Sequence, residues 1–289
     1  MKYKITHSTK YNYAQPVNLC HSEARLQLRK CPTQRCLSST IQVIPAPQSY
    51  HERLDYFANR VASFSLQQPH NQLIVVASSE IDVLPRGPMM PEMSLTWENA
   101  LTQASVLTEI PLLPIYAQDS QLAAASADIK AYAQESFKPG LTVYAVANDL
   151  TQRIYRNFSY DPSFTTIATP LATVLAHKRG VCQDFAHLAI ACFRAFGLPA
   201  RYVSGYLETT PPEGTIKLAG SDASHAWFSV YQPDYGWLDF DPTNNCKIGE
   251  QHITLAWGRD YNDVTPLKGL AIGSSQQQIS VAVDVIRQH

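Results

Sequence analysis

The pattern of apolar residues in this 289-residue chain changes from a helical to an extended period after residue 197. Before that point, apolar side chains recur at the three- and four-residue spacing of a buried helical face, and they are Phe185, Leu188, Ala189, Cys192, Phe193 and Phe196. Residues 201–207 are expected to form a core strand, and residues 224–231 alternate as a strand does. The sequence therefore predicts an α+β core in which a buried helix packs on an antiparallel sheet.

Cys182 is expected to occupy the first turn of this helix, directly after a turn at Gly180. The N–H groups of a first helical turn lack intrahelical partners and carry the positive end of the helix dipole, so a thiolate is stabilised there. Asp184 in the same turn suits the dipole, while Gly197 and Pro199 end the helix. The sequence thus predicts a reactive thiol at Cys182.

Two other side chains of the helix are expected to take no part in this chemistry. At about 100° per residue, Cys192 lies roughly 80° around the helix from Cys182 and on the apolar face, which favours core packing. His187 lies about 140° around the helix, so its ring points away from Cys182. A base for Cys182 must therefore come from elsewhere in the chain.

His225 and Asp241 are expected to lie on two strands of one antiparallel hairpin. His225 opens the strand 224–231, and Asp241 follows a second short strand at 237–240 after residues that favour a turn. The two side chains share a face only if the numbers of paired residues have an even sum, as a loop of three or five residues gives. A four-residue loop would separate them unless Gly236 forms a bulge.

Cys182, His225 and Asp241 are the residue types of a nucleophile, a base and an orienting carboxylate. Asp239 is a competing carboxylate on the same strand face. Each residue also has an ordinary structural explanation, since cysteines in helices usually pack and aspartates before proline usually form turns.

Four motifs in this order resemble the bacterial transglutaminase-like superfamily, whose members are often described as cysteine proteases. The motifs are residues 180–188, 200–207, 223–227 and 236–244. The resemblance covers residues 144–245, and residues 3–60 are similar to the β-rich N-terminal domain that accompanies this core. It implies a papain-like or transglutaminase-like core.

The resemblance also implies roles for individual residues. Cys182 would be the nucleophile, His225 the base and acid, and Asp241 the orienting carboxylate, because the family aspartate precedes Pro-Thr; Asp239 is the second choice. A side chain upstream of the cysteine near the oxyanion is also expected, and Tyr160 is the candidate.

Supporting roles at the site are also assigned to Gln183 and Trp227. Gln183 directly follows Cys182, and Trp227 shares the strand face of His225. Trp227 could shield His225 from solvent, although packing within the hairpin would equally explain it.

These assignments predict an enzyme that forms a thioester at Cys182 and hydrolyses peptide or amide bonds, as a cysteine protease or amidase. Transfer of a glutamine acyl group to an amine, or its deamidation, is the first alternative. A non-catalytic binding module of the same fold is the second. A zinc site built from Cys182, His225 and Asp241 is a third, but no Cys-x-x-Cys or His-Glu-x-x-His motif supports it. No cofactor or metal is expected, because no calcium-binding loop motif is present.

Composition and net charge restrict the kinds of molecule that this protein is expected to bind. A net charge of −1 gives no attraction to nucleic acid or to an anionic membrane, so neither is expected as a partner and a polyanionic substrate is not expected. The partner expected from the cysteine chemistry is a peptide or protein substrate. The first residues lack an apolar signal segment and no stretch reaches the length of a membrane span, so a cytoplasmic location is expected. The six cysteines show no disulfide spacing and are expected to be thiols. The sequence does not predict an oligomeric state.

The domain organisation is predicted from composition and periodicity. The expected parts are a β-rich domain at 1–85, a linker at 86–110, the catalytic core at 111–250 and a C-terminal β segment at 251–289 that packs on one of the two domains. Helices are expected at 126–137, 142–156 and 171–177.

Overall fold

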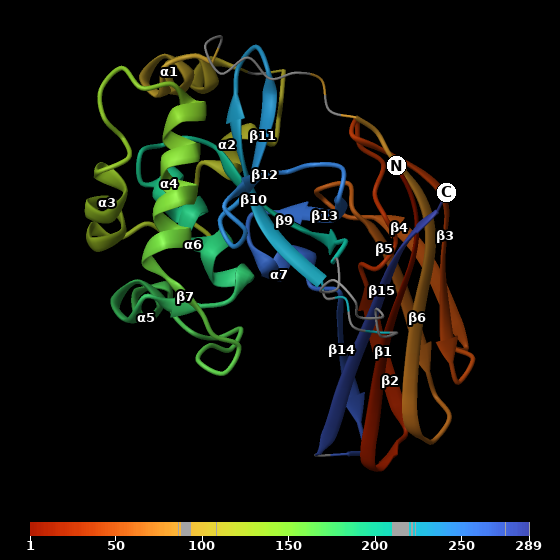
Figure 1. Cartoon of the computed structure of the whole chain (residues 1–289). Helices are drawn as coiled ribbons and strands as arrows, with labels where there is room; N and C mark the ends of the chain where they lie inside the picture. Colours follow the sequence, from red (N-terminus) through yellow and green to blue (C-terminus); the bar gives the residue numbers. More distant parts are fainter. Residues whose placement is uncertain are drawn as a thin grey trace, which may run out of the picture.

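The computed structural model consists of an N-terminal β-sandwich beside a core of helices and one sheet (Figure 1). It describes residues 1–85, 87, 94–107, 109–209, 220, 222, 224–274 and 276–288. This architecture confirms the predicted α+β class with a β-rich N-terminal domain.

The sandwich consists of two antiparallel four-stranded sheets, in the orders β15-β1-β6-β3 and β14-β2-β5-β4. Its strands from the beginning of the chain are β1 (Lys2–Val17), β2 (Leu19–Ala24), β3 (Gln34–Ile44), β4 (Ser49–Leu54), β5 (Arg60–Leu66) and β6 (His70–Val83). Alternate side chains of β1 and β6 are buried between the sheets, as the period of a half-buried strand requires.

The strands of the C-terminal segment belong to both parts of the molecule, the sandwich body and the core body. Strand β13 (His252–Gly258) joins the core sheet, whereas β14 (Leu267–Ile272) pairs with β2 and β15 (Gln277–Gln288) pairs with β1. The expectation that residues 251–289 pack on only one domain is therefore wrong. Alternating apolar residues predict a strand, but they carry no information about its pairing partner.

The core sheet has the strand order β12-β11-β10-β9-β13 and is antiparallel throughout. Its other strands are β9 (Ala200–Leu207), β10 (Ser224–Gln232), β11 (Gly236–Asp241) and β12 (Cys246–Lys247). Helix α6 (Cys182–Arg194) packs on β10 and β9, and all its residues from position 184 onward are buried. The predicted helix on an antiparallel sheet is confirmed.

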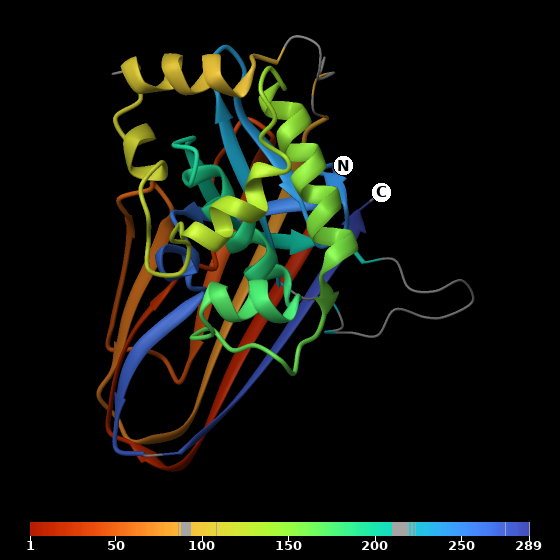
Figure 2. The same ribbon diagram turned by 90° about the vertical axis from the view of Figure 1, so that its left-hand side faces the viewer.

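The remaining helices surround α6, and Figure 2 looks onto this helical side of the core. They are α1 (Trp97–Val106), α2 (Leu113–Tyr116), α3 (Ala127–Gln134), α4 (Val143–Asn157), α5 (Leu171–His177) and α7 (Tyr261–Val264). Helices α3, α4 and α5 lie where the sequence predicts them. Among the described residues, no helix is long and apolar enough to cross a membrane.

Helix α1 belongs to the core, although its residues were expected to lie in a linker. The Trp97 ring packs edge-on against Phe137 and Phe196, with each pair of ring centroids 5.6 Å apart. Of the predicted linker, residues 86, 88–93 and 108 lie outside the described part of the chain.

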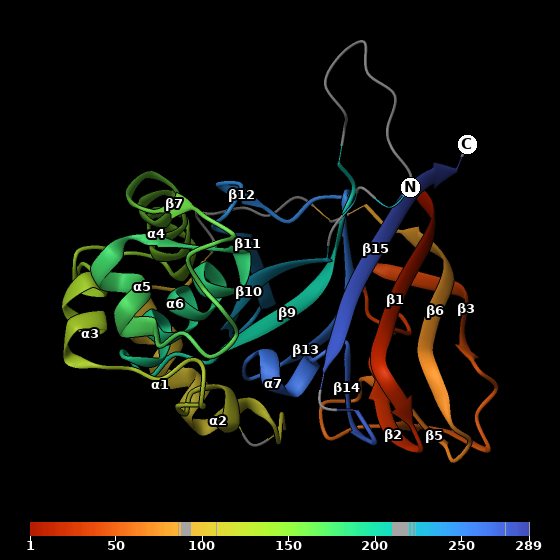
Figure 3. The same ribbon diagram turned by 90° about the horizontal axis from the view of Figure 1, so that it is seen from below.

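Side-chain amides of the sandwich bind the free edge of β13, which faces the sandwich in Figure 3. The Gln34 amide donates to the Thr254 carbonyl at 2.6 Å and accepts from the Thr254 N–H at 2.9 Å. Asn59 makes the same pair of bonds to Trp257, at 2.8 and 2.9 Å. These bonds satisfy backbone groups that an edge strand leaves unpaired, so they join the two bodies firmly.

Candidate active site

The start of α6 is held by a carboxylate that folds back on the preceding turn. One Asp184 oxygen accepts hydrogen bonds from the Val181 N–H at 2.8 Å and from the Thr165 hydroxyl at 2.7 Å. A Cβ atom at Gly180 would lie 2.8 Å from that oxygen, so glycine is what permits this approach. The capped turn holds Cys182, which is half-buried, at the first position of the helix.

The β10–β11 hairpin has the register that the site requires. Phe228 pairs with Phe240, and the turn between the strands consists of the three residues 233–235. Paired residue numbers therefore have an even sum, which is the alternative that places His225 and Asp241 on one face, and no bulge is needed. Asp241 consequently lies on the same strand face as His225.

His225 and Asp241 are joined by a short hydrogen bond, 2.7 Å from Nε2 to Oδ2. Asp241 is fully buried, and its Oδ1 accepts from the backbone N–H groups of Thr243 at 2.9 Å and of Asn244 at 3.1 Å. The Asn244 side-chain amide donates to Oδ2 at 2.7 Å. Although burial raises the pKa of Asp241, the bonds from His225 and His252 outweigh it, so the pKa lies well below its usual range.

Cys182 interacts with the same imidazole. Burial lowers the pKa of His225, but hydrogen bonds to Asp241 and to Cys182 raise it to about 10. Because Nε2 is held by Asp241, Nδ1 is the ring nitrogen left for the sulfur. The imidazole therefore lies between the buried Asp241 carboxylate and the Cys182 sulfur.

Asp239, the competing carboxylate, is engaged elsewhere. Its Oδ1 accepts a hydrogen bond from the Ser229 hydroxyl on the neighbouring strand. Of the two aspartates, Asp241 is the one whose carboxylate bonds His225.

Tyr160 is brought close to Cys182 by a short parallel ladder. In this ladder β7 (Ser159–Tyr160) pairs with β8 (Arg179–Gly180), which directly precedes α6. The phenol is 56% exposed. Burial raises its pKa, and the nearby Cys182 contributes. The partly buried Gln183 directly follows Cys182 on the helix.

Trp227 forms a buried wall behind the imidazoles. Its side chain is fully buried, and its ring centroid lies 6.3 Å from that of His225 and 5.5 Å from that of His252. With no exposed surface, it supports the site by packing and does not face a substrate.

Cys192 and His187, the two residues of α6 that were expected to take no part in the chemistry, are both buried. Cys192 is fully buried. His187 accepts a hydrogen bond from the Tyr261 N–H at 3.1 Å, and burial lowers its pKa to about 3.

His252 and Asn244 bind Asp241, and sequence analysis missed both roles. Asn244 stands in the Asp-Pro-Thr-Asn turn, where an aspartate commonly accepts backbone N–H groups two or three residues on, so a contact between Asn244 and Asp241 could have been expected. His252 stands in a buried strand with no motif around it, and only the pairing of β13 with β9 brings it near Asp241.

His225, Asp241 and His252 are also residue types that bind metals, with donor atoms within 4.8 Å of one another. Metal bonds of about 2.0–2.2 Å in a tetrahedral site separate neighbouring ligand atoms by roughly 3.3 Å. The 2.7 Å between His225 and Asp241 is too short for that and fits a hydrogen bond. A zinc ion bound by Cys182, His225 and Asp241 does not fit this geometry either, because His225 Nε2 and the Asp241 carboxylate are hydrogen-bonded to each other.

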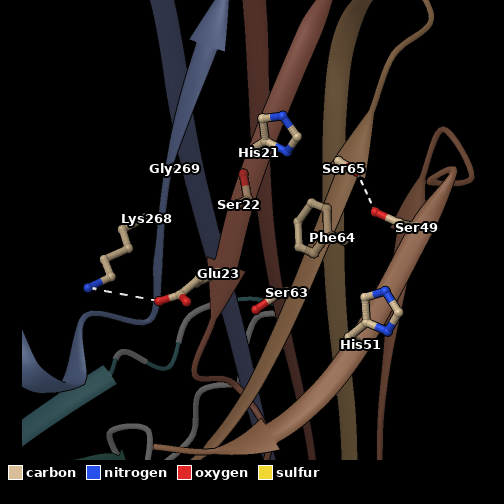
Figure 4. A pocket seen from close by; sticks show the side chains of 10 residues that line it. All are labelled: His21, Ser22, Glu23, Ser49, His51, Ser63, Phe64, Ser65, Lys268 and Gly269. Atoms are coloured by element: carbon tan, nitrogen blue, oxygen red, sulfur yellow. Dashed lines mark hydrogen bonds and ion pairs between the residues drawn. The ribbon is translucent and has the colours of Figure 1, made fainter.

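A surface depression of about 520 Å³ lies elsewhere, on the outer face of the sandwich sheet containing β2, β4, β5 and β14 (Figure 4). Ser49, Ser63 and Ser65 give it a floor of small side chains, and His21 and His51 stand along it. None of the residues that line it is a cysteine.

A cysteine at the start of a core helix, facing a histidine and an aspartate on a sheet hairpin, defines a transglutaminase-like fold. Residues 130–242 match the model of the transglutaminase-like superfamily, and residues 3–82 match that of the bacterial transglutaminase-like N-terminal region. An uncharacterized protein of Mycobacterium tuberculosis is 38% identical, over 99% of this chain and 92% of its own length. The chain belongs to the transglutaminase-like superfamily.

Two further proteins are similar to this chain. A structure of a candidate cysteine protease from Cytophaga hutchinsonii superposes with a TM-score of 0.78 at 21% identity, covering 100% of this chain and 92% of that one. It supports the fold. A protein-glutamine gamma-glutamyltransferase of Pseudomonas aeruginosa is 30% identical over 108 residues, which are 35% of this chain and 16% of that protein.

Proposed function

We propose that this protein is a cysteine-dependent acyl-transfer enzyme that forms a thioester at Cys182 and hydrolyses peptide or amide bonds. The observation that carries the proposal is the 2.7 Å bond from His225 to the buried Asp241, on an imidazole that also interacts with Cys182. A structural histidine would need neither an ionised buried partner nor a cysteine beside it.

In the proposed reaction, the Cys182 thiolate attacks the substrate carbonyl carbon while His225 carries the proton. The oxyanion is stabilised by the N–H groups at the start of α6, each such donor contributing about 3 kcal/mol, and Tyr160 is the proposed additional donor. The C–N bond breaks and the amine leaves with the proton of His225. Water then attacks the thioester carbonyl carbon and His225 accepts the proton of the water. The C–S bond breaks, the carboxylic acid leaves, and the Cys182 thiolate is regenerated.

Transfer to an amine is the second candidate, because the Pseudomonas relative is named a glutamyltransferase. Water and an amine compete for the same thioester, so both reactions would use Cys182, His225 and Asp241. We favour hydrolysis and a peptide or protein substrate, since no segment of the sequence identifiably builds an amine tunnel.

The test compares wild type with Cys182→Ala on a panel of peptides and glutamine-containing proteins, with and without a primary amine. Cleavage, ammonia release and amine adducts are measured separately by mass spectrometry and an ammonia assay. We expect cleavage or ammonia in wild type and none in Cys182→Ala, because the thioester cannot form. Adducts in place of cleavage would establish the amine-transfer alternative.

The matched control is Cys31→Ala, which removes a half-buried thiol in the N-terminal body. It should keep wild-type activity. Equal activity in wild type and Cys182→Ala would refute the proposal. A wild type that binds a panel peptide without turning it over would favour the binding module.

A further inference from the structure

Behind the candidate triad lies a second histidine on the same carboxylate. His252 begins β13 and is only 6% exposed. Its Nε2 lies 3.2 Å from Asp241 Oδ2, the oxygen that also bonds His225 at 2.7 Å. The ring centroids of the two histidines are 6.2 Å apart. His225 and His252 therefore converge on Asp241 from two strands of the sheet.

The surroundings of His252 determine which ring nitrogen carries its proton. The Gly249 N–H donates to Nδ1 at 3.3 Å, and a backbone N–H can only donate. Nδ1 is therefore the acceptor, and the proton of the neutral ring sits on Nε2, where it points at Asp241. Trp227 packs edge-on against the ring and prevents it from turning.

We infer that His252 is a positioning residue for the proposed reaction: as an Nε2–H donor it holds the Asp241 carboxylate aimed at His225. The inference rests on the proposed function, because it acts through His225 on Cys182. A buried carboxylate without donors would take up a proton and release the imidazole from its ion pair.

Other ionisable groups near Asp241 are few among the described residues. Besides His225 on the neighbouring β10 and His252 on β13 at the far edge of the sheet, Cys246 of β12 stands opposite Asp241. Burial and the Asp241 charge raise the pKa of the Cys246 thiol to about 11, so it stays neutral over the range of the test. Cys182 lies on the other side of His225.

The test needs no natural substrate. The rate of Cys182 alkylation by iodoacetamide is measured from pH 5 to 9.5 by peptide mass spectrometry in wild type, His252→Phe and His252→Gln. Phenylalanine fills the space without donating, so the midpoint of the reactivity profile should rise by about one pH unit and the rate at pH 6 should fall about tenfold. Glutamine carries an N–H donor in place of Nε2 and should restore the wild-type profile.

The outcomes separate the two proposals. If wild-type Cys182 reacts no faster at pH 6 than Cys31, the proposed function fails. If Cys182 is reactive but a folded His252→Phe keeps the wild-type midpoint, only the role of His252 is overturned.

Should His252→Phe not fold by circular dichroism, ¹⁵N NMR of the wild-type histidines decides. We expect the His252 ring to be neutral with its proton on Nε2, and the signal is assigned by its loss in His252→Gln. A charged ring, or a proton on Nδ1, would overturn the inference.

Discussion

Replacing Gly205 with alanine should disturb the wall of the candidate site more than the size of one methyl group suggests. Gly205 lies on β9 directly opposite His225. A Cβ atom there would sit 2.2 Å from the Ile253 carbonyl oxygen and 2.4 Å from the Trp227 ring. Neither can yield easily, because one is the backbone of the adjoining strand and the other is a fully buried ring.

The expected cost follows from these contacts. Overpacking a well-packed core usually costs 1–3 kcal/mol, and a clash with a strand backbone belongs at the top of that range, about 3 kcal/mol. For a chain of this size this is a fall in the unfolding temperature of about 5 °C or more. If β13 or Trp227 shifts to make room, His252 and His225 shift with it, so Cys182 should also lose reactivity.

The assay is thermal and urea unfolding followed by circular dichroism, together with iodoacetamide labelling of Cys182. Gly249→Ala is the matched control in the same body, because a Cβ atom there meets nothing within 4 Å and its φ is not positive. The control should unfold within about 1 °C of wild type. A Gly205→Ala protein as stable and reactive as wild type would refute the packing argument.

Two further predictions concern buried ionisable groups, the Asp241 carboxylate and the His7 imidazole. Asp241→Asn should lower activity at Cys182 by about 10²- to 10⁴-fold, because the amide places N–H groups against the donors of His225 and His252; steady-state kinetics on a panel substrate measures this. Burial lowers the pKa of His7 from 6.5 to about 4, so the unfolded chain takes up a proton first as pH falls. Stability should therefore decline from pH 6.5 to 4 by at most about 3 kcal/mol per such group, and His7→Gln should remove that share in urea unfolding.

Each of these has a result that contradicts it. Unchanged kinetics in a folded Asp241→Asn would show that the carboxylate charge is not needed. If the stability of His7→Gln falls as steeply toward acid pH as that of wild type, the loss is due to other groups, of which the buried His187 is one.

Much of the core could be predicted because its signals are local. The spacing of apolar residues predicts α6, and the turn residues predict the hairpin, while the even-sum rule states which register would bring His225 and Asp241 to one face. The position of Cys182 after Gly180 follows from the same helix. Each depends on neighbours within about twenty residues.

Other features could not be predicted, because periodicity tells that a face is buried and not what covers it. Residues 252–258 and 277–288 both read as strands, yet one joins the core sheet and the other pairs with the first strand of the sandwich. The helix after Trp97 follows a proline-rich stretch and looked like part of a linker, but its tryptophan packs into the core.

The sequence by itself determined the helix that carries Cys182, the presence of the hairpin and the residue types of the candidate triad. Only the tertiary structure decided that Asp241 bonds His225 while Asp239 bonds Ser229, and that His252 supports the carboxylate. The physical reason is range: backbone periodicity acts over a few residues, whereas a hydrogen bond between β11 and β13 depends on how the sheet assembles.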